Sequence, residues 1–225
     1  MATNSQPPTA DNQPSYRHII WDWNGTLFDD AWLCVAIMND MLAKRDMALI
    51  SAESYAAIFD FPVIDYYRQV GFDFAREPFE TVSTEFITGY ESRRAECSLR
   101  TGTVALLDWV RRQGLGQSIL SAAKQDFLRQ AVAAFGITDF FNTVNGVADH
   151  HAFGKVELGR TWAAQSGWRG DEVVLIGDTI HDYEVAQAIG VDCYLVPSGH
   201  QARERLVASG AKVLASPADL MGLLG

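Results

Sequence analysis

Short apolar runs recur along the chain, each bounded by glycine, proline or polar residues. They lie at residues 17–22, 117–121, 141–146, 173–177, 192–196 and 212–214. Because these runs are brief and apolar at successive positions, they are typical of parallel strands that are covered on both faces. The pattern therefore predicts a buried parallel sheet.

Helical patterns separate most of these strands. The clearest spans residues 124–135, which gather apolar side chains on one face and end before Gly136, a suitable C-terminal cap. Another spans about 180–189 and ends at Gly190. Strands that alternate with helices predict a doubly wound parallel α/β sheet of Rossmann-like type, with ligands bound at the carboxyl ends of the strands.

The alternation is interrupted after the first strand. Residues 33–42 repeat apolar side chains at helical spacing, and no strong strand pattern follows before residue 98. Further helix-like patterns begin after Ser51, Pro62 and Pro78. We expect an all-helical cap at residues 33–97, inserted into a core made of residues 16–32 and 98–225.

Charge and composition narrow the possible partners of this 225-residue chain. A formal net charge of -10 argues against broad contact with a phosphate backbone, so we expect no nucleic-acid partner. Residues 1–15 are polar and contain three prolines, and no apolar run reaches membrane-spanning length. We expect a disordered tail at residues 1–15, no membrane partner and a cytoplasmic protein.

The cysteines do not form a recognisable framework. Cys34, Cys97 and Cys193 are odd in number, far apart and not spaced as zinc ligands. We interpret them as free thiols in a reducing compartment.

Two of the predicted strands end in carboxylates. The first runs directly into Asp22, and the strand at 173–177 runs into Asp178, with Asp182 four residues further. Because the carboxyl ends of parallel strands meet at one edge of a sheet, these acids are expected to converge on one divalent cation, most often Mg²⁺. A strand-end carboxylate can also attack phosphorus and form a covalent intermediate, and Asp22 is our candidate nucleophile.

Together the two segments resemble the first and last signature motifs of the haloacid dehalogenase-like phosphatases. Ser121, at the end of a predicted strand, and Lys155, in Phe153-Gly154-Lys155-Val156, match the second and third motifs, although Val156 stands where many relatives have proline. The segments Tyr66-Tyr67-Arg68 and Gly71-Phe72-Asp73, within a helical cap, resemble the phosphoglycolate phosphatase-like branch.

The resemblance assigns roles to these positions. It implies that Asp22 becomes phosphorylated, and that Thr26, Ser121 and Lys155 bind the phosphoryl group. The metal ligands it implies are Asp22, the backbone carbonyl of Asn24, Asp178 and, through water, Asp182.

One position departs from the family pattern. Asn24 stands where phosphatases of this family usually carry the aspartate that acts as general acid and base. Such catalysis is typically worth about 10² to 10⁴ in rate, or roughly 3 to 5 kcal/mol, so its loss predicts slow turnover. Three compensations are open: an acidic leaving group, replacement by His181, or deamidation of Asn24-Gly25 to aspartate.

The leading hypothesis is a Mg²⁺-dependent phosphatase that hydrolyses a small phosphorylated metabolite through an aspartyl phosphate, as a monomer or homodimer. One alternative is a phosphonatase-like enzyme that cleaves carbon–phosphorus bonds with Lys44 of the cap. Another is a regulatory module that binds phosphate and metal without turnover. Residues set aside as surface groups, or as possible readers of the substrate, are Arg68, Arg76, Arg93, Arg94, His150 and His151.

Overall fold

The structure is a computed structural model that describes residues 16–148 and 154–224. The tail predicted at residues 1–15 and the segment containing His150 and His151 lie outside the described residues.

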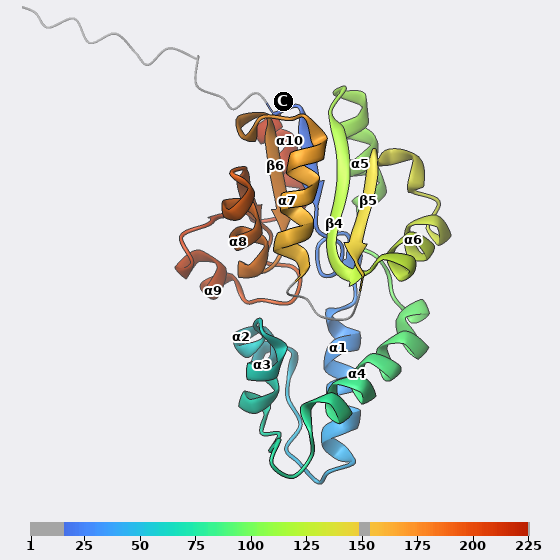
Figure 1. Cartoon of the computed structure of the whole chain (residues 1–225), viewed down its shortest axis with the longest axis vertical. Coiled ribbons are helices and arrows are strands. Elements are labelled where there is room, and N and C mark those ends of the chain that lie inside the picture. Colours follow the sequence, from blue (N-terminus) through green and yellow to red (C-terminus); the bar gives the residue numbers. More distant parts are fainter. Residues whose placement is uncertain (1–15, 149–153, 225) are drawn as a thin grey trace, which may run out of the picture.

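A six-stranded parallel sheet forms the centre of the molecule, in the order β5-β4-β1-β6-β7-β8 (Figure 1). Its strands are β1 (His18–Trp21), β4 (Gly116–Lys124), β5 (Thr143–Val147), β6 (Val173–Gly177), β7 (Asp192–Leu195) and β8 (Lys212–Val213). The predicted fold class is confirmed. Strand β4 runs three residues beyond the predicted end at 121, because a register shift between Leu120 and Lys124 lets it continue alongside β5.

The remaining regular elements are helices and one small two-stranded antiparallel sheet. The helices are α1 (Ala31–Ala43), α2 (Ala52–Ile58), α3 (Val63–Val70), α4 (Phe79–Arg93), α5 (Thr103–Arg112), α6 (Gln125–Ala134), α7 (Gly154–Ser166), α8 (Ile180–Ile189), α9 (Arg203–Ala208) and α10 (Leu220–Leu224). Short 3-10 turns occupy Arg94–Glu96, Thr138–Phe140, Gly170–Glu172 and Pro217–Asp219.

Side chains alternate across the sheet and build a core on each face. On one face, Ile19 and Trp21 of β1 lie in a cluster with residues of α5, α6 and α10. On the other, Ile20 packs in a cluster with residues of α7, α8 and α9. Because both faces are covered, the strands are apolar at nearly every position, as the sequence pattern indicated.

Helices α1 to α4, called here the helical insertion, lie beyond the carboxyl ends of β4 and β5 (Figure 1). Helices α2, α3 and α4 begin directly after Ser51, Pro62 and Pro78, as predicted. Both connections to the core pass through a two-stranded antiparallel sheet that the sequence did not predict, made of β2 (Phe28–Asp29) and β3 (Ser98–Leu99).

All three cysteines are free and buried, as interpreted from the sequence. Among the described residues, no helix combines the length and the apolar character that crossing a membrane requires.

Candidate active site

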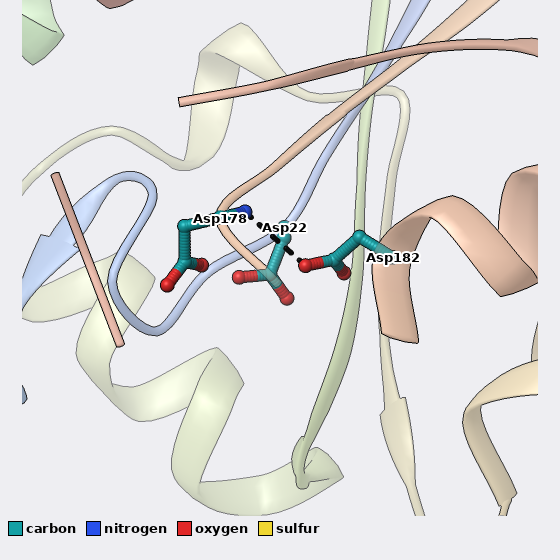
Figure 2. Close-up of side chains that lie close together, drawn as sticks. All are labelled: Asp22, Asp178 and Asp182. Atoms are coloured by element: carbon teal, nitrogen blue, oxygen red, sulfur yellow. Dashed lines mark hydrogen bonds between the residues drawn. The ribbon is translucent and has the colours of Figure 1, made fainter. Parts of the chain in front are cut away.

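Three carboxylates meet at the carboxyl edge of the sheet. Asp22 follows β1, Asp178 follows β6, and Asp182 lies in the first turn of α8. One oxygen of each lies within 4.8 Å of the others, and all three side chains are buried. Figure 2 shows Asp178 and Asp182 on either side of Asp22. We call Asp22, Asp178 and Asp182 the acidic trio.

Lys155 supplies a positive charge to this cluster. It lies in the first turn of α7 and is 3% exposed, and its Nζ lies 2.5 Å from an oxygen of Asp22 and 2.5 Å from an oxygen of Asp182. The second oxygen of Asp182 accepts hydrogen bonds from the backbone N–H groups of Asp178 and Thr179, and from the Thr179 hydroxyl. Asp182 therefore joins the start of α8 to Lys155.

The acidic trio sets three carboxylates against the one positive charge of Lys155. Burial raises the pKa of Asp22 well above its ordinary value, despite Lys155, whose single charge is shared with Asp182. Burial also raises the pKa of Asp178, to about 6. For Asp182, burial opposes ionisation but Lys155 and Thr179 outweigh it and lower the pKa.

The acidic trio fits a divalent cation by its chemistry and its surroundings. Carboxylate oxygens are the ligands that Mg²⁺ prefers, and the excess negative charge is what such an ion neutralises. Two glycines let neighbouring loops approach Asp178: a Cβ at Gly25 or Gly199 would lie 2.3 or 1.9 Å from its Oδ2. At Gly25 the φ angle is also +75°, a left-handed conformation that glycine adopts without strain.

Thr26 and Ser121, both predicted to bind phosphate, are buried beside the trio's strands. The Thr26 hydroxyl donates a hydrogen bond of 2.9 Å to Asp178 and so ties the loop after β1 to the end of β6. Ser121 lies two residues beyond Ile119, the β4 partner of Trp21, and its Oγ accepts a hydrogen bond from Ala123. Their contact with a phosphoryl group stays a prediction.

Asn24 belongs to a polar network that connects the loop after β1 with the helical insertion. Its Nδ2 donates hydrogen bonds to Asp30 at 2.6 Å and to the Tyr90 hydroxyl of α4 at 2.8 Å. The same hydroxyl donates to Asp30 at 2.7 Å. Asp30 is 1% exposed, and no role was predicted for it from the sequence.

His200 is a second positively charged group that the sequence analysis missed. Burial lowers its pKa, but Asp30 outweighs this effect and raises it to about 9, so the imidazole is protonated at neutral pH. Its ring lies between Asp30, at 3.4 Å, and the Tyr55 hydroxyl of α2, at 2.8 Å. The available signal was a histidine beside Gly199, in the loop that follows the carboxyl end of β7.

His181 was considered as a replacement for the general acid and base that Asn24 lacks, but its contacts lie elsewhere. Its Nδ1 contacts Glu184 on its own helix at 3.1 Å, and its ring packs against Phe61 of the helical insertion. Among the described residues, no hydrogen bond, ion pair or ring contact joins His181 to the acidic trio or to Asn24.

Lys44 and the arginines of the helical insertion are engaged elsewhere. Lys44 follows α1, is 65% exposed at its side chain and pairs with Glu85 at 2.6 Å. It lies 14 residues from Asp30 along this helix, or about 20 Å at 1.5 Å per residue. Arg68, Arg76 and Arg93 form exposed ion pairs within the insertion, and Arg94 stacks on Phe127 of α6.

Comparisons with known proteins agree with this geometry. The family model described as haloacid dehalogenase-like hydrolase matches residues 19–196, most of the chain and all members of the acidic trio. The chain belongs to the haloacid dehalogenase-like hydrolases. It is an enzyme of the phosphatase type, and the relatives that its sequence resembles include phosphoglycolate phosphatases.

Individual relatives are distant. The phosphoglycolate phosphatase of Synechococcus elongatus is 25% identical over 208 residues, which cover 90% of this chain and 94% of the relative. Tyrosine-protein kinase PtkA of Mycobacterium tuberculosis is 26% identical over 184 residues, covering 81% of this chain and 62% of the kinase. A haloacid dehalogenase-like hydrolase from Streptococcus pneumoniae has the same fold, with a TM-score of 0.80, 15% identity and coverage of 94% and 99%.

Proposed function

We propose that the protein is a Mg²⁺-dependent phosphatase that hydrolyses a small phosphorylated metabolite through an aspartyl phosphate on Asp22. The observation that carries this proposal is the acidic trio, buried at the meeting point of three elements and bridged by Lys155. Such an arrangement places a nucleophile, a cation and a site for a hard metal ion within one small volume.

In the first step, an oxygen of Asp22 attacks phosphorus and the bond from phosphorus to the ester oxygen breaks. Lys155 holds the Asp22 carboxylate in place and offsets part of the charge that the phosphoryl group adds. The leaving oxygen keeps the electron pair and takes a proton from solvent, because the neutral amide of Asn24 has none to give.

In the second step, a water oxygen attacks phosphorus and the bond between phosphorus and Asp22 breaks. The proton of that water passes to solvent, inorganic phosphate leaves, and the Asp22 carboxylate is restored. Without a carboxylate at position 24 to take this proton, hydrolysis of the intermediate is expected to limit turnover.

A bound Mg²⁺ would supply electrostatic stabilisation of the transferring phosphoryl group. Asp22, Asp178 and the backbone carbonyl of Asn24 would hold the ion, with Asp182 acting through water. We further propose that residues 33–97 act as a cap that covers the substrate and excludes water, because Tyr55 and Tyr90 reach the site from this segment.

The test is release of phosphate from a panel of sugar, acid and acyl phosphates that includes 2-phosphoglycolate. We expect slow release with Mg²⁺, little with EDTA, and none from Asp22→Ala. Asp108→Ala is the matched control, because this carboxylate lies on α5 and forms its ion pairs with the neighbouring Arg111 and Arg112. Activity that survives Asp22→Ala would refute the mechanism.

A second candidate is transfer of the phosphoryl group to a hydroxyl other than water. Two observations favour it: the similarity to tyrosine-protein kinase PtkA, and the lack of a water-activating carboxylate at Asn24. It predicts that an added phenol or tyrosine peptide takes the phosphoryl group from phosphorylated Asp22 faster than water does. Mass spectrometry of the acceptor distinguishes the two reactions.

The sequence left two alternatives open, a phosphonatase-like enzyme that uses Lys44 and a regulatory module without turnover. An imine-forming lysine needs a site beside the substrate, and the exposed, paired Lys44 at the far end of α1 does not offer one. A regulatory module would bind phosphate in the presence of Mg²⁺ and release none from any ester, which calorimetry and the phosphate assay report separately.

A further inference from the structure

The buried carboxylate of Asp30 is fully engaged. One oxygen accepts hydrogen bonds from Asn24 and from the Tyr90 hydroxyl, and the other accepts one from the backbone N–H of Gly25 at 3.0 Å and faces His200. These four partners satisfy the acceptor positions of an ionised carboxylate.

The Asn24 atom that lies 2.6 Å from Asp30 is the amide nitrogen, which donates a hydrogen bond to this carboxylate. The second N–H of that nitrogen is directed to the Tyr90 hydroxyl. Because the amide group is planar and both of its N–H bonds are taken, its oxygen is held on the side away from Asp30. The orientation of the Asn24 side chain is thereby fixed from two elements, α1 and α4.

We propose that Asp30 is a positioning residue for Asn24: with Tyr90 it fixes the amide so that its oxygen is a constant hydrogen-bond acceptor two residues from Asp22. This inference rests on the proposed function, to which it adds that the Asn24 oxygen accepts a hydrogen bond from the water that attacks phosphorus. The negative charge of this pair of residues then sits at position 30 and not at position 24.

Asn24→Asp would be expected to raise the rate if only the missing general acid and base mattered, but the contact with Asp30 predicts the opposite. Asn24→Asp restores the family residue, but it places a second carboxylate 2.6 Å from Asp30 in place of a donor. Two buried carboxylates at that distance repel each other, and the Tyr90 hydroxyl has only one hydrogen to share between them. Residue 24 is then driven out of its position.

The decisive experiment is a charge exchange. Wild type, Asn24→Asp, Asp30→Asn and the double variant Asn24→Asp/Asp30→Asn are compared for kcat, KM and Tm on the best substrate of the phosphate panel. Asn24→Asp is expected to lose at least about tenfold in kcat with little change in KM, since small misplacements cost up to about 10²-fold. The double variant again has one carboxylate and one amide, and it is expected to recover most of that loss.

The chain provides a control for the chemistry of the substitution. Asn39 of α1 is also half-buried and uses both ends of its amide, with Ile50, outside the site. Asn39→Asp is expected to lower Tm and leave kcat unchanged. A kcat of Asn24→Asp equal to or above that of wild type, or a double variant no better than Asn24→Asp, would overturn the proposal.

If the proposed function is wrong, the result differs from the two outcomes above. In that case wild type releases no phosphate, while the Tm values still test the pairing. Asn24→Asp is expected to lower Tm and the exchange to restore it, and additive losses in the double variant would overturn the positioning role on structural grounds.

Discussion

At the scale of single residues, the site depends on two cations, Lys155 and His200, that are surrounded by carboxylates. Lys155 is 3% and His200 is 6% exposed; burial opposes their charge, but the neighbouring carboxylates outweigh it and raise the pKa of each. Removing a partner from such a cluster leaves a buried charge without compensation, which costs far more than the loss of a surface ion pair.

Lys155→Met is therefore expected to lower phosphatase activity by about 10²-fold or more and to lower the free energy of unfolding by about 3 kcal/mol in metal-free protein. Part of the stability loss should be recovered with Mg²⁺, because the ion neutralises the same carboxylates. Urea unfolding with EDTA and with Mg²⁺ measures both effects.

Lys212→Met is the matched control for this substitution. Lys212 forms an exposed ion pair of 3.4 Å with Asp192, so its loss should change stability by less than about 1 kcal/mol. An equal stability loss in the two variants would contradict the role given to Lys155.

Deamidation of Asn24 is expected to be slow in the folded protein. The reaction requires the Gly25 nitrogen to attack the Asn24 side chain. In the folded protein the N–H group of Gly25 donates hydrogen bonds to the Phe28 carbonyl at 2.9 Å and to the Asp30 carboxylate at 3.0 Å. Peptide mapping after incubation at pH 8 should find little aspartate at position 24 in native protein and more in protein unfolded in urea. Equal rates in the two states would show that these bonds offer no protection.

The sequence predicted the residues whose position follows from the sheet. Asp22 and Asp178 end adjacent parallel strands, so their convergence needs no knowledge of side-chain contacts. Asp30, Tyr90 and His200 were not predicted, because they meet from three different elements and their contacts depend on how the helical insertion packs. A local pattern carries no information about such long-range pairs.

At the scale of elements, the helical insertion is joined to the core by a contact between the α2–α3 connection and the segment that leads into α9. Arg205 of α9 donates hydrogen bonds to the Phe59 carbonyl and to Asp60, and Gln201 donates to the same carbonyl. A backbone hydrogen bond of 2.9 Å joins Ala202 to Ala56. These bonds hold α2 and α3 over the site.

Arg205→Ala is expected to increase hydrogen exchange in residues 52–70 by about tenfold. It removes charge-assisted hydrogen bonds, worth about 1.5 to 3 kcal/mol each, from the contact that must break when this segment moves away from the core. It should also change KM more than the stability of the sheet. Exchange measured by mass spectrometry gives the regional rates.

Arg203→Ala serves as the comparison, because Arg203 is on the same helix and bonds the Leu214 carbonyl of the core. This variant should leave exchange in residues 52–70 unchanged. Were both variants to open the insertion equally, the contact through Arg205 and Asp60 would not be what holds it.

The sequence located the elements with strong local signals. Ser51 caps α2 through its side chain, and Pro62 and Pro78 fit the start of a helix, where a backbone N–H is not needed. The antiparallel pair of β2 and β3 was not predicted because two residues per strand are too few to show a period. The extension of β4 depends on pairing with β5 and on no pattern of its own.

At the scale of the whole molecule, acid stability depends on a histidine remote from the site. His18 of β1 is 2% exposed and packs against Trp162 and Trp168, and burial lowers its pKa to about 4. In the unfolded chain its pKa is about 6.5, so as pH falls from 6.5 to 4 the unfolded state gains a proton that the folded state does not.

The folded state should therefore lose up to about 3 kcal/mol over this range through His18 alone, at about 1.36 kcal/mol per pH unit. His18→Phe keeps a ring between the two tryptophans and cannot titrate. Its unfolding free energy should fall less between pH 7 and pH 4 than that of wild type. Parallel pH dependences in the two proteins would assign the acid sensitivity elsewhere.

The buried cysteines can report local opening of the structure without added probes. Cys34 of α1 and Cys97, just after α4, lie at the two ends of the insertion, whereas Cys193 lies in β7. A thiol-specific label added in excess can modify each sulfur only during the moments when its surroundings open. Faster modification of Cys34 and Cys97 than of Cys193 would show that the insertion opens more often than the sheet, and the two rates would measure that opening.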